Sequence, residues 1–229
     1  LKQLGDYPAA SLYETIPDFH NTPKRFQAFS QAVQRDVKNR ARLCREEIQF
    51  VLDREKDCGV LMEQLEQGKL PLRVTNNDTK LNNILFDKDT GKGLCIIDLD
   101  TIMPGLAAND FGDSIRFGAS TAEEDEKDLQ KVHFDLNLYK LYVKGYLEMA
   151  RDVLTPAEVK SLPWGARLMT LECGMRFLAD FLQGDVYFKT AYGEHNLVRA
   201  RTQFRLVKEM EEQFETMCRI AEEETKLNS

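Results

Sequence analysis

The chain has 229 residues, 42% of them hydrophobic and 30% charged, and its 31 basic and 38 acidic side chains give a formal charge of −7. This composition excludes global disorder, the lack of any apolar run near 20 residues excludes a membrane span, and the scattering of Lys and Arg among acids argues against nucleic-acid binding. Five cysteines without a CxxC pair, and an N-terminus without an apolar signal segment, predict a cytoplasmic protein with reduced thiols.

Helical patterns dominate the first part of the chain. Thr22-Pro23 predicts an N-cap followed by proline at the first helical position. The apolar stripe that follows is spaced by three or four residues: Phe26, Phe29, Val33 and Val37. The pattern continues less regularly to Gly59, and a second short helix is predicted over 60–67, before Gly68.

The period changes between Pro71 and Gly105. Two short apolar runs, 83–87 and 94–98, flank the turn-rich residues 88–93 and predict a small β-hairpin. Pro104-Gly105 predicts a turn after the hairpin.

The remaining patterns are helical. Asp135 is predicted to cap one helix, and Thr155–Glu158 reads as a capping box with proline in the first turn. Apolar spacings of three and four predict helices over 164–183 and 195–222, and the last residues, 222–229, are expected to fray. The expected fold class is therefore α+β, predominantly α-helical, and no domain boundary is visible in the composition.

The polar segment Asn76–Asn83 directly precedes the first strand of the hairpin, and Asp98 follows the second. The hairpin therefore brings the two loops that carry these acidic residues to the same end of its strands. Phosphoryl transfer needs a carboxylate for the proton of the acceptor hydroxyl and oxygen ligands for Mg²⁺ on the nucleotide phosphates. Asp78 fits the base, and Asn83 and Asp98 fit the metal ligands. Lys80 could neutralise the transferred phosphate.

A purely structural interpretation exists for each of these residues. Asn and Asp are common in turns before a strand, and strand ends are often polar, as at Asp98 and Asp100. A lone D-x-x-x-x-N would be a weak signal. Here the motif D-x-K-x-x-N is followed by a hairpin and then by a second Asp. This order favours a kinase, because the structural interpretation does not explain why both acidic loops converge at one end of the hairpin.

These segments resemble a known family. Residues 74–83 and 97–105 resemble the catalytic core of the aminoglycoside phosphotransferase and choline kinase superfamily, whose motif reads H-x-D-x-x-x-x-N followed by I-D-x-D. They are more similar still to the N-acetylhexosamine 1-kinases, and residues 14–21, 110–118 and 176–187 add to that likeness. The resemblance implies a protein-kinase-like fold, ATP and Mg²⁺ as cofactors, and phosphorylation of the anomeric hydroxyl of a GlcNAc or GalNAc sugar.

Two departures from the family pattern matter. Asn76 stands where the family has a His that hydrogen-bonds behind the catalytic loop. The chain also has no glycine-rich phosphate loop and no strand with an ATP-anchoring lysine. Residues 1–229 are therefore expected to be the C-terminal catalytic and substrate lobe, with the N-terminal nucleotide lobe of the same polypeptide preceding Leu1, which is not Met. Alone, this lobe is expected to bind ATP poorly and to turn over little.

The resemblance also implies that Arg176 and Tyr187 line the hexosamine pocket. From the residues alone, Arg176 has a second explanation. Glu172 and Asp180 lie four residues to either side and would form an ion-pair ladder on a solvent-facing side of the helix.

Further candidates for supporting roles are Asn76, Asp100 and Asp113. Asp113 and Arg116 are expected to brace the catalytic loop, and His20 lies where it could edge the sugar pocket. The three histidines show no paired spacing, so none is assigned to a metal.

Three other functions remain open. The first is a kinase of another small alcohol, such as choline or homoserine, although a choline site favours an aromatic cage and the chain has one Trp. The second is a non-catalytic kinase-like binding module, which Asn76 would signal. The third is a metal hydrolase that uses Asp78, Asp98 and Asp100, and it lacks supporting His ligands.

Overall fold

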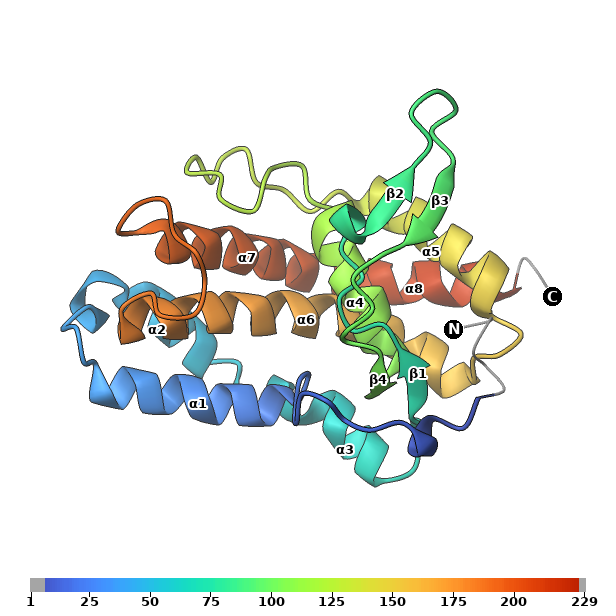
Figure 1. Ribbon diagram of the computed structural model, residues 1–229, viewed down its shortest axis with the longest axis horizontal. Helices are drawn as coiled ribbons and strands as arrows, with labels where there is room; N and C mark the ends of the chain where they lie inside the picture. Colours follow the sequence, from blue (N-terminus) through green and yellow to red (C-terminus); the bar gives the residue numbers. More distant parts are fainter. Residues whose placement is uncertain (1–6, 227–229) are drawn as a thin grey trace.

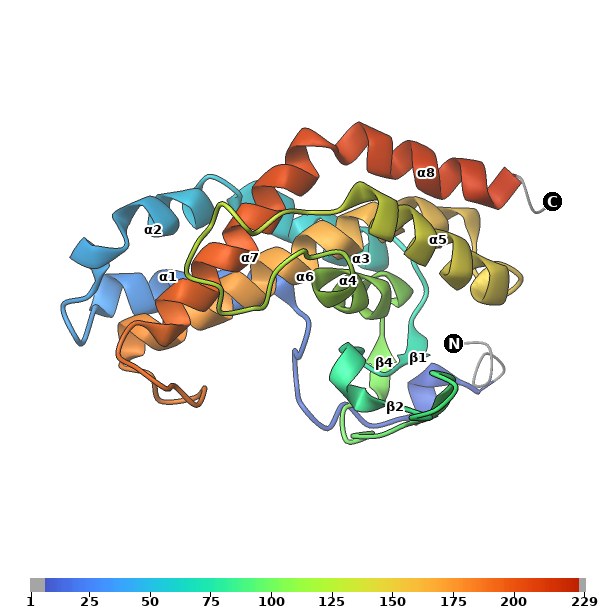
Figure 2. The same ribbon diagram turned by 90° about the horizontal axis from the view of Figure 1, so that it is seen from above.

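The computed structural model describes residues 7–226. Helices pack side by side around a long central helix, α6, and two small antiparallel sheets lie on one face, along the lower edge of Figure 2 (Figures 1 and 2). The helices are α1 (Thr22–Arg35), α2 (Arg45–Leu52), α3 (Val60–Glu66), α4 (Ala107–Gly118), α5 (Leu136–Ala150), α6 (Pro156–Gln183), α7 (His195–Glu212) and α8 (Phe214–Lys226). The strands are β1 (Arg73–Thr75), β2 (Ile84–Phe86), β3 (Gly93–Ile96) and β4 (Met103–Gly105).

The first predicted helix is shorter than its pattern indicated. Asn21, not Thr22, is the N-cap, and its side chain accepts the N–H of Lys24 at 3.1 Å. The helix ends at Asp36, which adopts a left-handed φ of 34°. The predicted continuation to Gly59 is wrong, because short 3₁₀ turns separate α1, α2 and α3.

The predicted hairpin is confirmed as β2 and β3, with Ile84 opposite Ile96. A second sheet, β1 with β4, was not predicted, and Pro104 lies within β4 opposite Val74 rather than in a turn. A two-stranded sheet tolerates this proline because each strand has a free edge, where the missing N–H breaks no ladder bond.

The caps of the later helices are confirmed. Asp135 accepts the N–H groups of the first turn of α5, and Thr155 and Glu158 form the reciprocal capping box of α6. That helix starts at Pro156, so the predicted segment 164–183 is only its larger part, and it runs through Pro163.

The last predicted helix is divided in two. α7 ends at Glu212 and α8 begins at Phe214. The tail expected to fray from Glu222 is helical to Lys226, and residues 227–229 lie outside the described part of the chain.

The buried side chains form two apolar clusters, and α6 contributes to both. One cluster lies against α1, α2 and the start of α7, and the other against α4, α5 and α8. All five cysteines are free thiols; Cys44 and Cys58 are buried and Cys95 is exposed. Among residues 7–226 no helix is long and apolar enough to cross a membrane.

Helices α4 and α6 cross at two glycines. A Cβ on Gly112 would collide with the carbonyl of Gly165, and a Cβ on Gly165 would collide with the carbonyl of Ala108. The two backbones therefore touch without side chains between them. The sequence did not predict α4, because its buried face includes polar residues and shows no simple apolar stripe.

We predict that Gly112→Ala and Gly165→Ala each lower the free energy of unfolding by about 1–3 kcal/mol or more, since the added methyl forces the helices apart. Gly145→Ala is the matched control, because its Cβ would meet nothing within 4 Å in the middle of α5. The control is expected to stabilise by about 0.5–1 kcal/mol. Urea denaturation followed by circular dichroism measures all three, and equal effects would contradict the crossing geometry.

Candidate active site

The candidate catalytic loop, residues 76–83, follows β1 and leads into β2. Its backbone is irregular, with a left-handed φ of 63° at Asn77 and a 3₁₀ turn over Leu81–Asn83. An irregular segment has no ladder of its own, so its peptide groups must find other partners.

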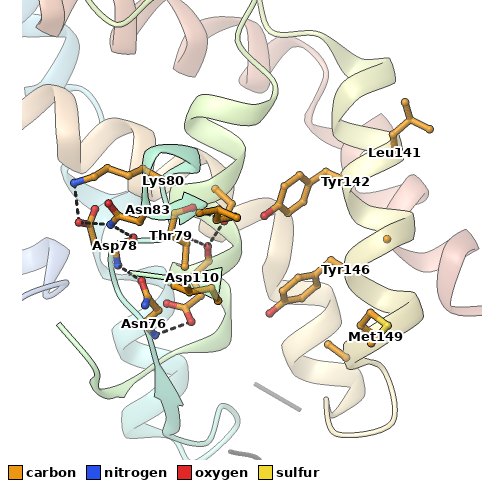
Figure 3. Close-up of a pocket in the computed structure, with 15 residues that line it drawn as sticks. Asn76, Asp78, Thr79, Lys80, Asn83, Asp110, Leu141, Tyr142, Tyr146 and Met149 are labelled. Atoms are coloured by element: carbon orange, nitrogen blue, oxygen red, sulfur yellow. Dashed lines mark hydrogen bonds and ion pairs between the residues drawn. The ribbon is translucent and has the colours of Figure 1, made fainter. Parts of the chain in front are cut away.

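The carboxylate of Asp110, on α4, holds two peptide groups of this loop. Oδ2 accepts the N–H of Asn76 at 2.9 Å (Figure 3). Oδ1 accepts the N–H of Asn77 at 2.7 Å. Burial raises the pKa of Asp110 to about 6, against the opposing effect of these two hydrogen bonds. At neutral pH the group is mostly ionised and accepts from both donors, which fixes the loop onto α4.

The carbonyl groups of four consecutive loop residues accept hydrogen bonds from side chains. The donors and acceptors are Thr101 to Asn76 (2.7 Å), His20 to Asn77 (3.0 Å), Asn83 to Asp78 (2.9 Å) and Ser114 to Thr79 (3.3 Å). Three of these donors come from segments outside the loop. The shape of the loop is therefore set by tertiary contacts.

The predicted base, Asp78, has one engaged and one open carboxylate oxygen. Oδ2 accepts from Lys80 Nζ at 2.8 Å and from Asn83 Nδ2 at 3.0 Å (Figure 3). Oδ1 has no hydrogen-bond donor among residues 7–226. The side chain is half-buried and lines a cavity, so this oxygen is the one available to a substrate hydroxyl.

The hairpin brings the two predicted metal ligands to the same end. The N–H of Ile97 donates to the carbonyl of Asn83 at 2.9 Å, which extends the ladder to the residue before Asp98. The side-chain amide nitrogen of Asn83 donates to Asp78, so the amide oxygen of Asn83 points away from Asp78. The side chain of Asp98 is exposed. Within the described residues no three His, Cys, Asp or Glu side chains gather to hold a metal. An amide oxygen and one carboxylate suit Mg²⁺ that is shared with phosphate oxygens.

The other residues predicted near the base have different positions. The ammonium of Lys80 is paired with Asp78. Asn76 Oδ1 accepts the N–H of Asp78 at 3.1 Å and so shapes the turn from within. Asp100 is exposed, and its carbonyl accepts from the Thr15 hydroxyl at 3.5 Å, which leaves its carboxylate outside this set.

The expected brace at Asp113 and Arg116 is formed. Their side chains are buried and paired at 3.0 Å, and Arg116 also binds Glu124 at 2.7 Å. The Thr79 hydroxyl lies 3.5 Å from Asp113, at the limit of a hydrogen bond. This pair therefore supports the loop from behind.

The ion-pair ladder proposed for Arg176 is absent from the described residues. Glu172 is buried and pairs with His20, while buried Asp180 accepts the N–H groups of residues 186–188 at 2.9–3.0 Å. The ladder fails because α6 is the central helix of the fold, so these faces do not meet solvent.

Arg176 instead lines a cavity of about 310 Å³. Its guanidinium carbon lies 5.5–5.8 Å from the ring centres of Phe19, Tyr187 and Phe188. Arg25 of α1 lines the same cavity, and burial together with the nearby charge of Arg176 lowers its pKa. The cavity thus has aromatic walls and two guanidinium groups, and both Arg176 and Tyr187 line it.

A short series of contacts joins this cavity to the base. Glu172 lies one turn of α6 before Arg176 and binds His20. The other ring nitrogen of His20 reaches the carbonyl of Asn77, the residue before Asp78.

The cavity that Asp78 itself lines is a different one, of about 580 Å³, and its lining residues include neither Arg176 nor Tyr187. Tyr142, Tyr146 and Met149 of α5 face the catalytic loop across it (Figure 3). The hydroxyl of Tyr146 is buried without a partner in the described residues. This wall is mainly apolar, in contrast to the arginine-lined cavity.

Comparison with known proteins identifies the family. A family model described as "Phosphotransferase enzyme family" matches residues 1–142. The chain belongs to this phosphotransferase family. The chain also resembles the crystal structure of a choline kinase from Cryptosporidium parvum Iowa II, with a TM-score of 0.56 and 15% sequence identity. The match covers 93% of this chain and 61% of that one, and it shows a shared protein-kinase-like fold. The predicted α+β, mainly helical fold class is confirmed.

Several residues that hold the candidate site had no assigned role in the sequence analysis. The loop is contacted by Thr101, Asp110 and Ser114, which lie 18 to 31 residues beyond its end at Asn83. Arg25 lies far upstream, on α1. No local spacing could have found them; only the resemblance of residues 97–105 and 110–118 pointed to two of these segments.

We predict that Asp110→Asn lowers the free energy of unfolding of the chain by about 1–3 kcal/mol, because the new amide turns a donor toward a buried backbone N–H. Urea denaturation at pH 7 measures the change. Asp89→Asn, an exposed carboxylate on the hairpin turn, is the control and should shift stability by less than about 0.5 kcal/mol. Equal small effects would mean that the loop does not depend on Asp110.

Proposed function

We propose that this chain is the catalytic and acceptor-binding lobe of an ATP-dependent kinase that phosphorylates the anomeric hydroxyl of an N-acetylhexosamine. The observation that carries the proposal is the carboxylate of Asp78, held in a fixed loop with one oxygen engaged by Lys80 and Asn83 and the other open. Membership of the phosphotransferase family supports phosphoryl transfer in general.

The proposed reaction moves one proton and one phosphoryl group. The acceptor hydroxyl donates a hydrogen bond to Asp78 Oδ1. As its oxygen bonds to the γ-phosphorus of ATP and the bond from that phosphorus to the ADP oxygen breaks, the hydroxyl proton passes to Asp78. The ammonium of Lys80 lies 2.8 Å from Asp78 Oδ2 and places positive charge beside the transferred group.

Asn83 and Asp98 would hold Mg²⁺ with the nucleotide. When bound, the ion neutralises charge on the nucleotide phosphates. The hydrogen bond from Asn83 to Asp78 fixes the orientation of its amide and so links the geometry of the metal ligand to that of the base.

The arginine-lined cavity favours a sugar over choline. Choline sites surround a quaternary ammonium with aromatic rings. Here the rings of Phe19, Tyr187 and Phe188 already surround the guanidinium of Arg176, and Arg25 adds a second positive charge. Two guanidinium groups repel a cation and donate well to hydroxyl and acetamide oxygens. Choline kinase activity is kept as the alternative, because a solved choline kinase shares the fold.

A nucleotide-binding lobe of the same polypeptide is the partner we propose. The hairpin carries large apolar side chains that are 46–64% exposed: Leu85, Phe86, Leu94 and Ile96. Exposed apolar patches of this kind commonly mark interaction surfaces. A lobe that covers this hairpin would enclose the nucleotide between itself and the loop that carries Asp98.

The five free cysteines support a cytoplasmic location, which we include in the proposal. The metal-hydrolase alternative is disfavoured, because Asp78, Asp98 and Asp100 form no three-ligand cluster. The binding-module alternative is separated from the enzyme by the following experiment.

In the protein that includes the nucleotide lobe, Asp78→Asn is expected to lower kcat by about 10²–10⁴-fold, because the amide cannot accept the proton. Steady-state assays with ATP, Mg²⁺ and N-acetylglucosamine measure the loss. Asp89→Asn is the control of equal charge change and should retain activity. If the wild type and Asp78→Asn are equally inactive toward every acceptor, the chain is a binding module.

A panel of acceptors tests specificity. N-Acetylglucosamine and N-acetylgalactosamine are expected to be phosphorylated, and choline and homoserine are not. Arg176→Ala should raise the KM for the sugar by about 10-fold or more, with a smaller change in kcat, since a lost charged hydrogen bond costs about 1.5–3 kcal/mol. Phosphorylation of choline without the sugars would reverse the assignment.

A further inference from the structure

His20 connects the central helix to the catalytic loop. It precedes α1, and its ring is 11% exposed. Nδ1 lies 2.9 Å from Glu172 Oε1, and Nε2 lies 3.0 Å from the carbonyl oxygen of Asn77. The ring therefore bridges two segments that are about a hundred residues apart in the sequence.

The partners of the ring determine where its protons lie. A carbonyl oxygen can only accept, so Nε2 must carry a proton toward Asn77. Glu172 Oε2 accepts from the Thr22 hydroxyl at 2.8 Å, which leaves Oε1 to accept from Nδ1. Protons on both ring nitrogens make His20 an imidazolium and Glu172 a carboxylate.

The surrounding charges favour this ion pair. Burial opposes the charge of His20, but the hydrogen bond and charge of Glu172 hold its pKa above the usual value. Burial likewise opposes the charge of Glu172, yet His20 holds its pKa below the usual value. Asp110 and Asp113 of α4 also favour a positive His20.

On the other side, Arg25 of α1 and Arg176 of α6 favour a negative Glu172. The charged groups on every element around the pair therefore support the same protonation state.

The bond from His20 acts on the peptide group that precedes the base. That peptide is held at both ends, because His20 binds the oxygen of Asn77 and the Asn76 side chain accepts the N–H of Asp78. Asn77 has a positive φ, a conformation that asparagine tolerates better than most other residues do. The hydrogen bond from a charged donor fixes the direction in which Asp78 leaves the backbone.

We propose that the His20–Glu172 ion pair is a positioning device for Asp78, in which the imidazolium holds the catalytic loop in its active shape. The proposal rests on the proposed function in so far as Asp78 is the base. Because Phe19 and Arg176 adjoin the two members of the pair and line the acceptor cavity, the same pair aligns that cavity with the base.

His20→Gln and Glu172→Gln test the proposal in the protein that includes the nucleotide lobe. Glutamine at position 20 keeps a neutral donor, and at position 172 it keeps an acceptor without charge. Each variant is expected to lower kcat by about 10- to 100-fold, the cost of a misplaced catalytic group, with less than about 3-fold change in the KM for the acceptor. His133→Gln, a half-exposed histidine paired with Glu209, is the matched control and should change neither constant.

The pH profile separates positioning from a merely structural role. Because the pKa of His20 is raised and that of Glu172 is lowered, the ion pair is present between these two values and is lost as pH rises through the pKa of His20. Wild-type kcat should therefore fall on the alkaline side, and this fall should be absent from both glutamine variants. Unchanged kcat, or an alkaline fall that persists in both variants, would overturn the proposal.

Nuclear magnetic resonance of this chain tests the ion pair without any assay of activity. The ¹⁵N shifts of the ring, assigned by their loss in His20→Gln, should show two protonated nitrogens at pH 7. The amide signal of Asp78 should shift in His20→Gln and stay in place in His133→Gln. A neutral His20 ring at pH 7, or an unmoved Asp78 signal, would refute the positioning role of the ion pair, whether or not any acceptor is phosphorylated. Inactivity with both signals as expected would refute only the proposed function.

Discussion

The carboxylate of Asp110 accepts the peptide N–H groups of Asn76 and Asn77, and the geometry of the site depends on this contact. The loop before β2 is too irregular to satisfy its own backbone, so an acceptor with two oxygens must come from elsewhere. A single buried carboxylate meets both donors, and the remaining peptide groups are then met by Thr101, His20 and Ser114.

The position of Asp110 follows from the close crossing of α4 and α6. At Gly112 and Gly165 the two helices touch backbone to backbone, which places the first turn of α4 directly behind the loop. The same α6 carries Glu172 and Arg176, so one rigid helix supports the loop through His20 and lines the cavity that holds the two arginines. The close helix crossing thus determines the relative positions of groups that are far apart in the sequence.

The buried charged side chains of Asp180 and Glu158 accept hydrogen bonds from backbone N–H groups, pair with an oppositely charged side chain, or do both. Asp180 accepts three consecutive N–H groups of the loop after α6, and Glu158 closes the N-terminus of the same helix while pairing with Arg73. A buried charge is tolerated only when hydrogen bonds replace its lost water. Asp78 differs, because one of its oxygens is open to a cavity.

The sequence by itself determined the local structure: the hairpin, the caps at Asp135 and Thr155, and the order Asp78, Asn83, Asp98 that indicated phosphoryl transfer. These features depend on neighbours within a few residues, whose spacing can be read directly. The tertiary structure decided the break after Asp36 and the pairing of β1 with β4, because both depend on contacts with distant segments.

The partners of the site were also decided by the tertiary structure. Glu172 and Asp180 look like a surface ladder in the sequence, yet each is buried and bound to another segment. Asp110, His20 and Arg25 carry no local pattern at all. Their roles arise only when packing around α6 brings them to one loop and one cavity. A hydrogen bond between two residues that are far apart in the sequence cannot be predicted from the spacing of the residues around each of them.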